Sequence, residues 1–81
     1  MTIKDLLPGQ QATIIGINKG EAARNRLLAM GITPGSNITL LASHPFRGPL
    51  TVAIGNTRLA LGREIASAVE VMPAPEKQKN E

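Results

Sequence analysis

The chain has 81 residues, no cysteine and one aromatic residue, and its nine basic and six acidic side chains give a net charge of +3. This length is typical of a single domain, and the lack of cysteine excludes disulfides and thiolate metal sites. The sequence contains no signal peptide and no apolar run of the ~20 residues that span a bilayer, so we expect a cytoplasmic protein.

The N-terminal part predicts a short helical turn, a tight turn and a strand. The helical turn covers Ile3–Leu7 and is closed by Pro8-Gly9. This pair is the signature of a type II turn, because proline presets φ and glycine accepts a positive φ. The strand that follows, Ala12–Ile17, is rich in β-branched residues, which favour extended backbone.

The next segment, Glu21–Met30, predicts the one long helix of the chain because it is rich in strong helix formers. Asn18 is expected to cap its start. Its apolar residues form one stripe at i, i+4 and i+7, namely Ala23, Leu27 and Met30. Gly31 supplies the left-handed residue that ends a helix, and Ile32 is expected to pack back on Leu27.

A second proline–glycine pair, Pro34-Gly35, follows the first at an offset of 26 residues and introduces a strand over Asn37–Ala42. Two copies are too few for a repeat protein. We therefore interpret the pairs as a shared local device that lets two strands begin in one small sheet at similar angles.

The C-terminal half predicts three further strands. Leu50–Ile54 and Thr57–Leu61 alternate apolar and small or polar residues and flank Gly55-Asn56, a two-residue connection typical of a β-hairpin. Gly62–Ser67 is expected to form a single 3₁₀ turn, and Val69–Val71 the last strand.

These elements predict a mostly β fold, an SH3-like barrel of five short strands with one α-helix inserted after the first strand. Closure of the sheet hides the strand edges that an open sheet exposes. We expect the barrel to occupy residues 1–72. Residues 73–81 are polar and contain proline without apolar periodicity, so they predict a disordered tail.

Several motifs occur in an order that resembles a known family. They are Arg26-Leu27-Leu28, Met30-Gly31-Ile32-Thr33-Pro34-Gly35, Pro49-Leu50, Leu59-Ala60-Leu61, Ala66 and Glu70-Val71. Over residues 3–72 the chain resembles the FeoA family, small cytosolic accessory proteins of bacterial ferrous-iron uptake. The resemblance implies an SH3-like barrel without enzymatic activity or cofactor. It also implies binding to the cytosolic, GTP-hydrolysing part of the membrane transporter FeoB. The chain departs from the family pattern at Arg47-Gly48, where many relatives have Gly-Asp, and at Gly62, where a basic residue is common.

The residues themselves predict no metal site and no catalytic centre. A ferrous site needs a set such as two histidines and a carboxylate, and the chain has one histidine, His44. The acidic residues of the predicted barrel lie far apart in the sequence: Asp5, Glu21, Glu64 and Glu70. No serine has an evident base partner, and no phosphate-binding glycine loop is present.

Two surfaces are candidates for a partner. The loop between the second and third strands, residues 43–50, carries Phe46 beside Arg47, and aromatic and arginine side chains are frequent at interface hot spots. An arginine supplied in trans can stimulate GTP hydrolysis, and Arg47 is the candidate. The alternative is that Phe46 folds back over the barrel end as core. Arg24 and Arg26 on the helix form the second candidate, with a solvated charged face as the alternative.

Two other functions stay open. A nucleic-acid-binding barrel is favoured by the basic charge and disfavoured by the scattered charges and the single aromatic residue. A transition-metal-responsive regulatory domain, related to the C-terminal domains of iron-dependent repressors, would build a metal site between protomers from His44 and carboxylates. The absence of a DNA-binding helix pair favours FeoA.

Overall fold

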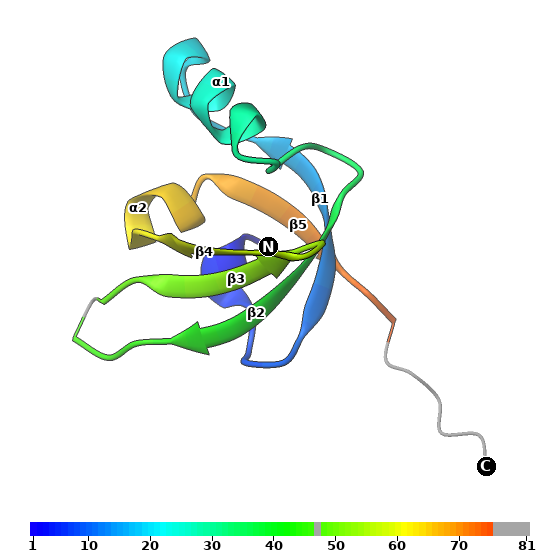
Figure 1. Ribbon diagram of the computed structural model, residues 1–81, viewed down its shortest axis with the longest axis vertical. Helices are drawn as coiled ribbons and strands as arrows, with labels where there is room; N and C mark the ends of the chain where they lie inside the picture. The colour runs from blue at the N-terminus through cyan, green and yellow to red at the C-terminus, as the bar shows by residue number, and fades with distance from the viewer. Residues whose placement is uncertain (47, 76–81) are drawn as a thin grey trace.

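The computed structural model describes residues 1–46 and 48–75, and in this part of the chain five antiparallel strands form one sheet that curls around the core (Figure 1). The strands are β1 (Gln11–Ile17), β2 (Asn37–Ser43), β3 (Leu50–Ile54), β4 (Thr57–Leu61) and β5 (Val69–Pro73). Their order across the sheet is β4-β3-β2-β1-β5. A 3₁₀ turn, η1 (Ile3–Asp5), precedes β1, α1 (Glu21–Ala29) follows it, and α2 (Arg63–Ala66) precedes β5. The mostly β class with a helix inserted after the first strand is confirmed.

The core is apolar, and no polar or charged side chain of the described residues is buried. It is formed mainly by the inward-facing residues of the strands, with η1, the end of α1 and α2 closing the open parts. The fully buried large side chains are Ile3, Ile14, Ile32, Ile38, Leu40, Leu50, Val52, Val69 and Val71. No helix in the described ranges is long and apolar enough to cross a membrane.

The two proline–glycine pairs form matching turns, as predicted. In each turn the fourth residue donates its N–H to the carbonyl of the first, at 2.9 Å in residues 7–10 and at 3.1 Å in residues 33–36. Gly9 and Gly35 have φ of 89° and 94°. A positive φ at the third position is what a type II turn requires of its glycine.

Each turn is bonded to the strand that follows the other turn. Gly9 donates its N–H to the carbonyl of Leu40 in β2 at 2.6 Å, and Gly35 donates to the carbonyl of Ile14 in β1 at 2.7 Å. Both donors and both acceptors are 26 residues apart in the sequence, so β1 and β2 are related by an approximate local two-fold axis. The expected similar angles are wrong, because the two strands are antiparallel: they pair at their first residues, such as Thr13 with Asn37, and run from there in opposite directions.

The helix α1 ends as predicted, but its start and its packing differ from the prediction. Ile32 donates its N–H to the carbonyl of Leu27 at 3.0 Å, and Gly31, with φ of 93°, donates to the carbonyl of Leu28 at 3.0 Å. These two bonds are the Schellman motif. The N-terminal cap is Gly20, and the expected cap Asn18 instead donates its backbone N–H to the carbonyl of Ala68.

The predicted apolar stripe of α1 is buried only at Leu27. Ala23 is half-buried, and Met30 is 37% exposed and caps the helix, which ends at Ala29. Figure 1 shows α1 projecting beyond the sheet, so only the end of the helix packs on the core. An apolar stripe in the sequence does not show whether the whole helix face packs on the sheet or part of the helix extends beyond the sheet.

Several element bounds also need correction. Residues 63–66 form one turn of α-helix and not a 3₁₀ turn, because Ala66 and Ser67 donate their N–H groups to the carbonyls four residues earlier, Gly62 and Arg63. The last strand extends to Pro73, and Ala74 donates its N–H to Gln11 at 2.9 Å. The predicted tail therefore does not begin at residue 73, and residues 76–81 of it lie outside the described residues.

The N-terminal turn η1 depends on one carboxylate. The Thr2 N–H donates to Oδ2 of Asp5 at 2.9 Å, and this hydrogen bond lowers the pKa of Asp5 below its ordinary value of 3.8. Because the folded pKa is lowered, the stabilisation is present above pH 3.8 and is lost as the pH falls through the folded value.

We therefore expect η1 to loosen in acid while the sheet stays intact. The amide resonance of Thr2 should titrate with the Asp5 carboxyl, at a midpoint below 3.8. An Asp5→Asn variant, whose amide oxygen does not ionise, should show no such step at Thr2. A Thr2 resonance that titrates equally in both proteins would contradict the assignment.

Candidate functional site

The loop between β2 and β3 is hydrogen-bonded and lies at the ends of these two interior strands of the sheet. His44 donates its backbone N–H to the carbonyl of Pro49 at 3.2 Å, which extends the β2–β3 ladder beyond the strands. Gly48 donates its N–H to the carbonyl of Pro45 at 3.1 Å, which brings these two residues together. Backbone bonds thus hold the loop, and the side chains of His44, Pro45 and Phe46 are exposed.

Phe46 stands at the tip of this loop and is 96% exposed. The alternative that it folds back as core is wrong. Its φ is 57°, and it is the sole non-glycine residue of the described ranges with a positive φ. The left-handed conformation costs an ordinary side chain about 1–2 kcal/mol. An apolar ring that is held in water on a strained backbone has no evident use in the folded monomer, and such strain clusters at binding sites.

The base of the loop is bonded to α2 by Arg63. Its Nη2 donates to the backbone carbonyl of His44 at 3.0 Å. Sequence reasoning missed Arg63, because its contact lies 19 residues away in the chain and no local pattern marks it. Arg47, the other candidate of this loop, lies outside the described residues.

The second candidate surface is the helix α1. Arg24 and Arg26 are both exposed, and neither side chain has an ion pair or hydrogen bond with another described residue. In Figure 1, α1 lies on the opposite side of α2 from the β2–β3 loop, so the arginines of α1 are separated from that loop. The structure therefore does not bring the two candidate surfaces together.

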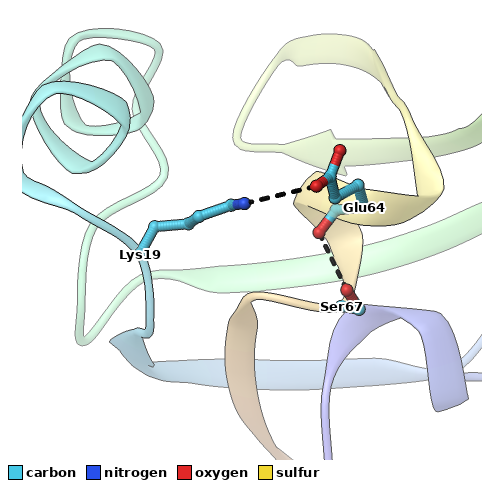
Figure 2. A network of polar contacts seen from close by, with 3 residues as sticks. All are labelled: Lys19, Glu64 and Ser67. Atoms are coloured by element: carbon cyan, nitrogen blue, oxygen red, sulfur yellow. Dashed lines mark hydrogen bonds and ion pairs between the residues drawn. The ribbon is translucent and has the colours of Figure 1, made fainter.

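One ion pair of the described residues connects the base of α1 to α2 (Figure 2). Nζ of Lys19, which precedes α1, lies 3.6 Å from Oε2 of Glu64. Oγ of Ser67 donates to the backbone carbonyl of Glu64 at 2.8 Å and closes the C-terminal end of α2. Because the Glu64 side chain is 84% exposed, this pair contributes at most a small free energy of folding.

Ionisable groups that could hold a metal are dispersed. No group of three His, Asp or Glu residues comes together within the described ranges. His44 is exposed on the β2–β3 loop, and its backbone, not its imidazole, makes the hydrogen bonds that fix the loop.

Comparison with known proteins identifies the family. A sequence model of the FeoA domain matches residues 1–73. The chain is 34% identical over 71 residues to an Fe(2+) transport protein A/Fe(2+) transporter FeoB fusion protein of Porphyromonas gingivalis. The match covers 88% of this chain and 8% of the fusion protein, so the chain spans only a small part of that relative.

Two solved structures have the same fold. A crystal structure of an iron uptake regulatory protein, FeoA, superposes with a TM-score of 0.85 at 35% identity, over 91% of this chain and 97% of that chain. The zinc complex of FeoA from Stenotrophomonas maltophilia, described as a prokaryotic SH3 domain protein, gives a TM-score of 0.77 at 29% identity, over 88% of each chain. The SH3-like fold is thereby confirmed, and the chain belongs to the FeoA domain family.

Proposed function

We propose that this protein supports ferrous iron transport by binding a FeoB-type membrane transporter through the cytosolic, GTP-hydrolysing part of that transporter. The observation that carries the proposal is the Porphyromonas gingivalis relative, in which a domain similar to this chain is fused to FeoB. A covalent link raises the effective concentration of one domain at the other, which is useful where the two domains act together. The proposal requires a cytoplasmic location and no catalysis by this chain.

The loop geometry supports a docking role. An exposed aromatic side chain on a pre-formed turn buries a large apolar area when it enters a pocket, at a small loss of conformational entropy. Phe46 has this arrangement. It is therefore our first candidate contact, and the exposed arginines of α1, Arg24 and Arg26, are the second.

Titration of the protein against the soluble GTP-hydrolysing part of the transporter from the same organism tests this function. We expect saturable binding, with a different affinity in the presence of GTP and in its absence. The Arg24→Ala and Arg26→Ala variants separate the helix surface from the loop. Absence of binding in every nucleotide state would contradict a contact with this part of the transporter.

Arg47 is the candidate for a more specific effect. If the contact stimulates GTP hydrolysis through an arginine supplied in trans, Arg47→Ala should lose most of the stimulation, because such arginines contribute about 10³-fold or more. Arg58→Ala is the matched control, since Arg58 is an exposed arginine on β4. Equal stimulation by Arg47→Ala and the wild-type protein would show that Arg47 has no such role.

A further inference from the structure

We propose that Arg63 is a positioning residue for Phe46 in the β2–β3 loop. In this assignment its guanidinium holds the His44 carbonyl and so fixes the backbone that leads to Phe46. The partner contact itself rests on the function proposed above, whereas the effect of Arg63 on the loop does not depend on it.

The first support is the way in which His44 is held. Its N–H is bonded to the carbonyl of Pro49 at 3.2 Å, and its carbonyl accepts from Nη2 of Arg63 at 3.0 Å. Both backbone groups of the residue that opens the turn are therefore engaged. Only the second bond comes from outside the loop and its strands, so it restrains His44 relative to α2.

The second support is the placement of one guanidinium atom, Nε of Arg63, in a side chain that is otherwise half-buried. Its Nε is inaccessible to solvent and has no hydrogen-bond partner among the described residues. Leaving a donor of a charged group unpaired in this way is unfavourable. An arginine that served only to cover apolar surface could extend into water, so the observed placement is explained by the bond to His44 that it allows.

The third support is the tight packing of the loop on itself. A Cβ added at Gly48 would lie 2.9 Å from Cβ of His44 and 3.1 Å from the carbonyl oxygen of Pro45. The backbone of Gly48 therefore packs closely against His44 and Pro45, and a side chain at this position would clash while His44 stays in place. If His44 is released, the strained backbone of Phe46 is free to relax, and the partner would have to order the ring again at a cost in affinity.

Arg63→Met tests the assignment, because methionine keeps an apolar stem of similar length and removes the donor. Arg58→Met is the matched control. In the free protein we expect the amide order parameters of Phe46 and Gly48 to fall from about 0.85 toward 0.6 in Arg63→Met. They should not change in Arg58→Met. Binding to the soluble GTP-hydrolysing part of the transporter should weaken about fivefold, the effect of losing one such hydrogen bond.

A double-mutant cycle distinguishes positioning from direct contact. If Arg63 acts through Phe46, adding Arg63→Met to Phe46→Ala should weaken binding no further. A full additional fivefold loss would mean that Arg63 touches the partner itself, which overturns the proposal. Unchanged loop order parameters in Arg63→Met would overturn it as well, whether or not the affinity for the transporter changes. If the wild-type protein does not bind the transporter, the proposed function fails, and the order parameters still decide whether Arg63 fixes the loop.

Discussion

Phe46→Asn is expected to weaken binding to the transporter's soluble GTP-hydrolysing part by about 30-fold or more, the effect of losing an interface hot spot. The same change should raise the free energy of unfolding of the free protein by about 0.5–1 kcal/mol, because asparagine tolerates the left-handed backbone better than phenylalanine. With the ring 96% exposed, its removal takes almost no packing from the folded state. Binding titration and urea denaturation measure the two effects.

This prediction is specific because the same substitution is expected to weaken binding and to stabilise the folded protein. A residue that matters for folding loses stability and binding together, whereas one that is strained for the sake of a contact gains stability as it loses the contact. Leu7→Asn is the control, because Leu7 is another exposed apolar side chain, 69% accessible, in a different turn. It should leave binding unchanged. Unaltered binding by Phe46→Asn, or a loss of stability, would contradict a docking role for the ring.

The features that could be predicted from the sequence are those encoded by a few adjacent residues. Pro8-Gly9 and Pro34-Gly35 encode type II turns because the backbone angles follow from the residue types alone, and both turns form. Gly31 and Ile32 likewise encode the end of α1. The hairpin at Gly55-Asn56 joins β3 to β4 with the expected strand bounds.

The features that could not be predicted depend on contacts between distant segments. The local two-fold relation of β1 and β2 arises when each turn donates to the opposite strand, which alignment of the two motifs alone does not reveal. The strands β1, β2 and β5 are longer than expected because pairing partners extend their ladders, at Gln11, Ser43 and Pro73. The position of α1 beyond the sheet also has no local signal.

The candidate site likewise has one residue that the sequence predicts and one that it does not. Residue type was enough to select Phe46, but its exposure and positive φ required the structure. Arg63 carries no signal in the sequence, because its role follows from the position of α2 against the β2–β3 loop. A positioning residue of this kind is found only when the hydrogen-bond partners of the loop are identified in the structure.

Leu40→Ala should produce the largest loss of stability, about 3 kcal/mol within the 2–5 kcal/mol range for fully buried leucines. Leu40 is 0% exposed in the central strand β2. Its carbonyl accepts from Gly9, and its N–H donates to the carbonyl of Gln10 at 3.0 Å. Small domains have about 5–15 kcal/mol in total, so the variant should unfold at a much lower urea concentration.

The neighbouring residue, Leu41, provides the sharpest control, because it lies on the opposite face of β2 from Leu40. Successive side chains of a strand point to opposite faces, and Leu41 is accordingly 37% exposed, so Leu41→Ala should cost about 1 kcal/mol or less. A one-residue slip of the strand would exchange the two environments. Equal losses for Leu40→Ala and Leu41→Ala would therefore contradict this register. A large loss for Leu40→Ala alone would support the register that places the β2–β3 loop, and with it Phe46, at the ends of these two strands.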